Sequence, residues 1–99
     1  MLRHIVMMKF KERDTANENA QKVKQMLNDL VGTVDSLKSM EVGINVNSKP
    51  TAFDLVLTAD FDDEAGLNSY RVHPLHIKIL DFMKEKVDKT AVVDYFKTT

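Results

Sequence analysis

The 99-residue chain contains no cysteine, only three glycines and only two prolines. Without cysteine the protein forms no disulfide and offers no thiolate, which excludes a disulfide-stapled secreted scaffold and cysteine-dependent catalysis. The glycines, Gly32, Gly43 and Gly66, are too far apart to form a glycine-rich loop that cradles phosphate. A Gly-x-Ser-x-Gly motif is also missing, so the sequence does not indicate a serine nucleophile.

An excess of charge of one sign and long apolar runs are missing as well. The 14 basic and 15 acidic residues leave a formal net charge of -1, which does not favour a nucleic-acid partner. No run approaches the roughly 20 apolar residues of a membrane helix. Lys9 and Lys11 interrupt the apolar N-terminus before it resembles a signal peptide. We therefore expect a soluble cytoplasmic protein with no nucleic-acid partner and no membrane association.

The composition that remains is that of one globular domain over residues 1–99, with 43% apolar and 29% charged residues. Thr15 and Glu18 have the spacing of a capping box, and Pro74 is suited to the first turn of a helix. Hydrophobic periodicity predicts strand 2–10, helix 16–31, strands 37–46 and 53–61, a helix ending near 71, helix 74–86 and strand 91–96. This βαββαβ order predicts an α+β, ferredoxin-like fold with a four-stranded antiparallel sheet.

Several predicted strands carry apolar residues on both faces. In strand 2–10, Val6 and Met8 alternate with Ile5 and Met7, and two valines are adjacent at 92–93. Two helices cover only one face of a four-stranded sheet, so the other apolar face needs a separate cover. A second copy of the chain is the simplest cover, and we predict a homodimer that forms through the sheet face.

The residues best suited to chemistry lie in segment 69–77 and at the two ends of the chain. His76 lies on the apolar stripe of its helix and is expected to face inward, whereas His73 occupies the N-cap, where imidazole is unusual. His4 lies in the first strand, on a face that alternation alone does not orient. Asp94 lies in an apolar strand, so it either faces solvent at an edge or has a buried partner such as a histidine. The predicted fold places the strands of His4 and Asp94 side by side.

Each of these residues also has a structural interpretation. A histidine on an apolar face is more often a hydrogen-bonded core residue than a catalyst, and Tyr70 is by default a packing residue with a satisfied hydroxyl. Three histidines and a carboxylate also suit zinc. However, a His73-x-x-His76 pair without cysteines or a carboxylate at matched spacing is a weak metal motif, and we predict no metal site.

Three motifs resemble those of the stress-responsive α/β-barrel domain family, also called dimeric α+β barrel domains. They are His-Ile-Val-Met-Met-Lys-Phe-Lys at 4–11, Tyr-x-x-His-Pro-x-His at 70–76 and Val-Val-Asp-Tyr at 92–95. The resemblance covers essentially the whole chain, in order and with fitting spacings. It implies ferredoxin-like monomers that pair so that two sheets form a barrel.

The family includes plant polyketide cyclases, to which this sequence is similar at each key position. That similarity implies that His76 is the catalytic base and that Asp94 orients it. It also implies that Tyr70, His4 and His73 contribute to the pocket, His73 chiefly in a structural role. The implied reaction is an intramolecular aldol condensation of a carbonyl substrate, for which an imidazole base and a tyrosine donor suffice without any cofactor.

Three functions therefore stay open. The first is a homodimeric small-molecule-binding protein with a pocket centred on His76, which as an enzyme would act on a carbonyl compound. The second is a non-catalytic stress-response or stability protein whose polar cluster is structural. The third is an accessory domain that binds a partner protein through the sheet edge. The first function predicts an open cavity between sheet and helices that reaches His76 and Tyr70, with His76 hydrogen-bonded to Asp94.

Overall fold

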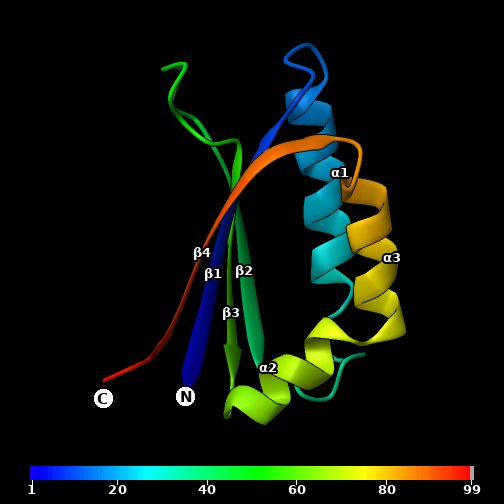
Figure 1. Cartoon of the computed structure of the whole chain (residues 1–99), viewed down its shortest axis with the longest axis vertical. Coiled ribbons are helices and arrows are strands. Elements are labelled where there is room, and N and C mark those ends of the chain that lie inside the picture. The colour runs from blue at the N-terminus through cyan, green and yellow to red at the C-terminus, as the bar shows by residue number, and fades with distance from the viewer. Residues whose placement is uncertain (99) are drawn as a thin grey trace.

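A computed structural model describes residues 1–98 as one sheet with helices on one side (Figure 1). The four strands pair in the order β2-β3-β1-β4, and every neighbouring pair is antiparallel. This arrangement confirms the predicted α+β, ferredoxin-like fold. The elements in chain order are β1 (Leu2–Phe10), α1 (Ala16–Asn28), β2 (Ser39–Ile44), β3 (Leu55–Phe61), α2 (Glu64–Arg71), α3 (Pro74–Met83) and β4 (Val87–Phe96).

The predicted β1 is correct at both ends, but the other strands differ in length from their predictions. The hairpin strands β2 and β3 are shorter than predicted, because Asn45 and Asn47 accept hydrogen bonds from backbone N–H groups two residues ahead and form turns. Strand β4 starts four residues earlier than predicted, since Val87 pairs with Phe10 beyond an irregularity in β1. Helix α3 correspondingly ends at Met83 rather than near residue 86.

The predicted capping box at the start of α1 is wrong in its hydrogen bonds. Thr15 is the N-cap residue, but its backbone has φ -108° and ψ 7° and its side chain makes no capping bond. Its hydroxyl instead accepts a hydrogen bond from the Asn19 amide at 3.3 Å. The reason is that a capping side chain requires an extended backbone. Asp63 has that conformation at the start of α2 and accepts from the Gly66 N–H at 2.9 Å.

The core lies between the sheet and the helices. Strand alternation sends Leu2, Met8 and Phe10 of β1 to the helical side of the sheet, where they are almost fully buried. Asp54, just before β3, accepts the Phe10 N–H at 2.8 Å and a bidentate pair of bonds from Arg13 at 2.8 and 2.7 Å. The Arg13 guanidinium lowers the pKa of the Asp54 carboxyl, and the contact ties the end of β1 to the start of β3.

The opposite face of the sheet carries apolar side chains that no part of the described chain covers. The paired residues Met7 and Val56 are 40% and 37% exposed, and Val93 beside Ile5 is 59% exposed. Apolar residues on both faces were predicted from alternation, and the structure confirms them. No helix among residues 1–98 is long and apolar enough to cross a membrane.

Candidate functional site

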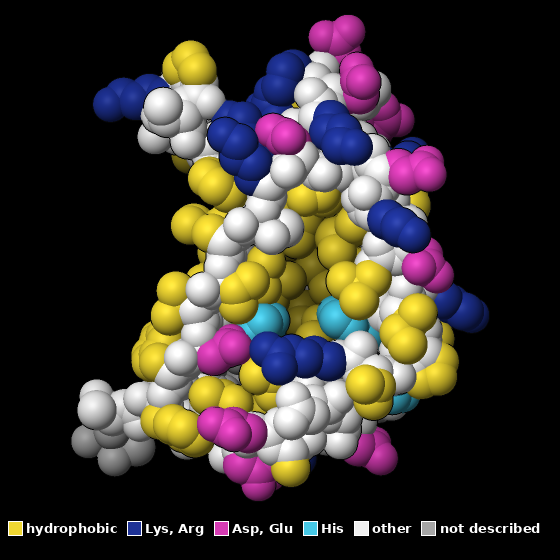
Figure 2. All heavy atoms as spheres, viewed as in Figure 1, with side chains coloured by type: hydrophobic (Ala, Val, Ile, Leu, Met, Phe, Trp, Pro, Cys, Tyr) yellow, Lys and Arg dark blue, Asp and Glu magenta, His cyan; other side chains and the backbone are white. Residues whose placement is uncertain are grey.

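A cavity of about 390 Å³ lies between the inner face of the sheet and helices α1 and α3. Figure 2 shows it as an apolar hollow between β4 and α3, with histidine side chains at one end. The predicted cavity that reaches His76 and Tyr70 is therefore present. Its lining residues are His4, Val6, Met8, Leu27, Leu57, Tyr70, Arg71, His76, Leu80, Met83, Thr90 and Val92.

His4 enters this cavity from β1 and is held by Asp94 on the neighbouring strand. The two residues lie opposite each other in the antiparallel register, and His4 Nδ1 is 2.5 Å from Asp94 Oδ1. Because a carboxylate oxygen accepts, the Nδ1–H of His4 donates to Asp94, and Nε2 of the same ring is left for a ligand. The predicted neighbourhood of His4 and Asp94 is confirmed, as is a histidine partner for Asp94.

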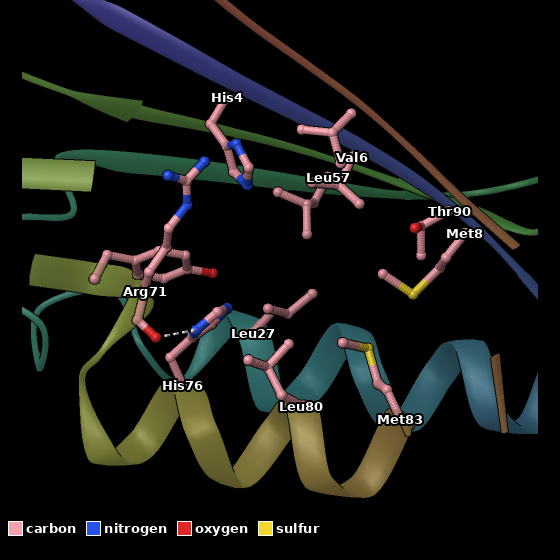
Figure 3. Close-up of a pocket in the computed structure, with 12 residues that line it drawn as sticks. His4, Val6, Met8, Leu27, Leu57, Arg71, His76, Leu80, Met83 and Thr90 are labelled. Atoms are coloured by element: carbon pink, nitrogen blue, oxygen red, sulfur yellow. Dashed lines mark hydrogen bonds between the residues drawn. The ribbon is translucent and has the colours of Figure 1, made fainter. Parts of the chain in front are cut away.

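His76 is not bonded to Asp94, so that part of the sequence prediction is wrong. Its Nδ1–H donates to the backbone carbonyl of Arg71 at 3.2 Å (Figure 3). That carbonyl lies in the last turn of α2, where helix carbonyls lack a partner within the helix. Asp94 instead uses its second oxygen to accept from Arg71 Nη2 at 3.2 Å. His76 therefore faces the cavity without a carboxylate behind it.

Burial determines the protonation state of His76. Loss of hydration lowers the pKa of the imidazole below its ordinary value of 6.5, and the nearby His4 and Arg71 side chains lower it further. The ring is therefore neutral at pH 7, and with Nδ1–H committed to Arg71 its Nε2 is a free acceptor. Figure 3 shows His4 and His76 extending toward the same space from the sheet and from α3.

Tyr70 brings a buried hydroxyl to the same cavity. Its side chain is 1% exposed, and its ring lies 5.1 Å from that of Phe61 and 4.2 Å from that of His76 between centroids. Within the described residues the hydroxyl has no hydrogen-bond partner, and burial raises the pKa of Tyr70, so the group stays protonated. A buried donor normally has a partner, which here would be a molecule in the cavity.

His73 is not among the residues that line the cavity, and its predicted place at the N-cap is confirmed. It is the N-cap of α3, and its Nδ1 accepts the Leu75 N–H at 3.1 Å. Pro74 forces the preceding residue away from helical geometry, and His73 is extended with φ -64° and ψ 133°. That conformation lets even an imidazole cap the helix.

Arg71 is the cavity residue that sequence reasoning missed. Its guanidinium donates to Asp94 and, at 3.3 Å, to the Asn68 side chain. A cation in the last turn of a helix is a common surface feature, so only its place directly after Tyr70 hinted at a role. As for metal binding, no group of three histidine or acidic residues able to hold an ion occurs among residues 1–98.

The arrangement can carry out proton transfer on a ligand in an apolar setting. Each imidazole leaves its Nε2 for a ligand, and the Tyr70 hydroxyl is a donor with no partner among residues 1–98. Asp94 is placed to stabilise positive charge on the His4 ring when it forms. Most of the remaining lining is aliphatic or methionine.

Comparisons with known proteins show the family of this chain. The sequence profile described as the stress responsive A/B barrel domain matches residues 2–97. A stress-response A/B barrel domain-containing protein of Arabidopsis thaliana is 27% identical over 96 residues, which span 94% of this chain and 83% of that protein. Olivetolic acid cyclase of Cannabis sativa is 23% identical over 96 residues, which span 95% of this chain and 94% of the cyclase.

Solved structures give the same result for the fold. A dimeric protein of unknown function with a ferredoxin-like fold from Bacteroides fragilis has a TM-score of 0.86 to this chain at 24% identity. The match covers 95% of this chain and 93% of that one. Together with the profile match over nearly the whole sequence, these findings mean that the chain belongs to the stress responsive A/B barrel domain family.

Proposed function

We propose that this protein is a homodimeric, small-molecule-binding enzyme that moves a proton at the carbon next to a carbonyl group, as a cofactor-free cyclase does. One observation carries the proposal: His4, Tyr70 and His76 converge on one apolar cavity, and each offers that cavity a polar group without a protein partner. The similarity to olivetolic acid cyclase supports it.

The roles follow from the surroundings of each group. His76 is the base, because burial keeps its ring neutral and its Nε2 is free to take the proton. Tyr70 donates to the ligand oxygen on which negative charge develops. His4 acts from its charged form, which Asp94 stabilises: it gives its Nε2 proton to the oxygen of a second carbonyl and becomes neutral. His76 keeps the proton taken from carbon until exchange with solvent returns both rings to their starting forms. Two imidazoles in different surroundings thus divide the acid and base steps.

The apolar lining indicates the kind of ligand. Val6, Leu27 and Leu57 form an aliphatic wall, while Met8 and Met83 reach the cavity from the sheet and from α3 (Figure 3). An alkyl or aromatic chain gains free energy on leaving water for such a surface. The ligand is therefore a carbonyl compound with an apolar chain, and an intramolecular aldol closure is the reaction that both imidazoles serve.

The test is exchange of the α-protons of 2-heptanone for deuterium in D₂O, followed by ¹H NMR. The wild-type protein is expected to accelerate exchange above the buffer rate. His76→Gln is expected to reduce the accelerated rate by about 10²-fold or more, the usual contribution of a positioned base. His73→Asn is the matched control, because asparagine also caps a helix and the residue lies outside the cavity.

Two results would contradict the proposal. One is a folded wild-type protein that leaves exchange at the buffer rate over the whole pH range in which it is stable. The other is full acceleration by a folded His76→Gln variant. Either result, combined with a loss of stability on removal of the polar side chains, would favour the alternative of a non-catalytic stress-response or stability protein whose cluster is structural.

A further inference from the structure

Within residues 1–98, Arg71 is the only formally charged side chain that lines the apolar cavity. Its guanidinium lies at the polar end, beside His4 (Figure 3). The other polar residues there, His4, Tyr70 and His76, carry groups suited to proton transfer. A single permanent cation at the end of an otherwise uncharged cavity favours a ligand that carries one negative charge.

The guanidinium has hydrogen-bonding capacity to spare. Arginine offers five N–H donors, and Arg71 uses one on Nη1 for Asn68 and one on Nη2 for Asp94. Its side chain is 47% exposed, and the other three N–H groups donate no hydrogen bond to residues 1–98. A planar guanidinium with adjacent free donors matches the two oxygens of a carboxylate.

Asp94 does not cancel this preference within the cavity. Its two oxygens are taken by His4 and by Arg71, at 2.5 and 3.2 Å. It lines a separate, smaller pocket with Glu64 and Asn68 and does not line the apolar cavity, whereas Arg71 lines both. Of this ion pair, Arg71 is therefore the member that reaches the apolar cavity.

We propose that Arg71 recognises a carboxylate on the ligand, so that the substrate or product is an amphipathic carboxylic acid whose apolar chain fills the cavity. This inference rests on the proposed function for the location of the ligand. A carboxylate at Arg71 places the first carbons of the chain beside His4, Tyr70 and His76. A 3-oxo acid with an apolar chain fits both the anion site and the base.

The test compares three probes with the same eight-carbon chain: octanoate, octan-1-ol and octylamine. Each is titrated into ¹⁵N-labelled protein below its micelle concentration, and dissociation constants are taken from amide shifts of cavity residues. The wild type is expected to bind octanoate about tenfold or more tightly than octan-1-ol, as a charge-assisted hydrogen bond allows, and octylamine most weakly. In Arg71→Gln the ratio of octanoate to octan-1-ol affinity should fall to about one, while Arg71→Lys should keep part of it.

Lys78→Gln is the control, because it removes one positive charge from α3 at a residue that does not line the cavity. It should leave the ratio unchanged. Equal affinity of the wild type for octanoate and octan-1-ol would overturn the inference without any variant, and so would an unchanged ratio in a folded Arg71→Gln. The ketone exchange assay separates the two proposals. If the protein accelerates deuterium exchange but does not prefer octanoate, only the proposed carboxylate site is contradicted. If it prefers octanoate but does not accelerate exchange, only the proposed enzymatic function is contradicted.

Discussion

At the scale of single residues, the two imidazoles of the site differ in the group to which each ring donates a hydrogen bond. His4 donates to a carboxylate and His76 donates to a backbone carbonyl. A carboxylate stabilises positive charge on the first ring, whereas burial and the Arg71 guanidinium oppose positive charge on the second. The same residue type is thereby suited to two opposite tasks in one cavity.

The lowered pKa of His76 has a consequence for stability. Between the folded pKa and 6.5 the unfolded chain binds more protons at this residue than the folded protein does. The free energy of unfolding therefore falls as the pH drops below about 6.5, and this residue contributes no pH dependence above that value. We expect the wild type to lose more stability than His76→Gln between about pH 7 and pH 5.

Urea denaturation at fixed protein concentration measures this difference. The buried carboxyls Asp54 and Asp60 do not interfere, because their pKa values lie below 3.8 and their losses begin at lower pH. If the free energy of unfolding falls equally with pH in the wild type and in His76→Gln across this range, the fold does not hold His76 neutral.

At the scale of elements, the break between α2 and α3 assembles the polar end of the cavity. Tyr70 and Arg71 close α2, and His76 lies in the first turn of α3 only three residues after His73. Without the interruption before Pro74, one continuous helix would present these side chains at ordinary helical spacing. The break instead lets His76 donate back to the Arg71 carbonyl.

The cap that starts α3 is expected to stabilise the protein. His73→Ala removes the acceptor of the Leu75 N–H and should lower the free energy of unfolding by about 1 kcal/mol, whereas His73→Asn should retain most of it. All three proteins are compared at the same pH, because Nδ1 accepts only when it carries no proton. Equal stability of His73→Ala and the wild type would mean that the observed cap contributes nothing.

At the scale of the whole molecule, the uncovered face of the sheet explains the proposed homodimer. The helices cover the inner face only (Figure 1), and Met7, Val56 and Val93 leave an apolar surface on the other. A structural neighbour with this fold is dimeric. A second copy would remove that surface from water while leaving the cavity, which lies on the helical side, accessible.

The dimer is tested by light scattering after size exclusion. The wild type is expected at twice the 11.3 kDa chain mass, and Val93→Lys at the mass of one chain, because a lysine charge in the interface would be desolvated without a partner. Val31→Lys is the matched control: Val31 is 45% exposed, but it follows α1 and lies off the sheet. A wild-type monomer at micromolar concentration, or a dimeric Val93→Lys, would contradict the proposed interface.

Much of the fold could be predicted because its signals are local. Alternation in β1, the turn residues before β3 and Pro74 each act over a few residues. The errors lie where a distant contact overrides a local pattern. Val87 joined β4 because Phe10 was available to pair with it. Thr15 failed to cap α1 because its backbone is not extended there.

The candidate site, too, could be predicted from the sequence only in part. His4, Tyr70, His76 and Asp94 were identified from residue type and position, and the prediction that His4 and Asp94 are neighbours is confirmed by strand register. The predicted hydrogen bond between His76 and Asp94 was wrong, because His76 donates to the Arg71 carbonyl. Arg71 was missed because nothing in its sequence context distinguishes an arginine beside a cavity from one on a solvated helix end.

By itself, the sequence determined the order of the elements, the two apolar faces of the sheet and the set of polar side chains available for chemistry. Only the tertiary structure decided that Asp94 bonds to His4 rather than to His76, that His76 turns back to Arg71 and that the buried Tyr70 hydroxyl has no partner among residues 1–98. The physical reason is that hydrophobic periodicity depends on residues close together in the sequence. Side-chain partners, in contrast, depend on how a helix packs on a sheet, to within the length of one hydrogen bond.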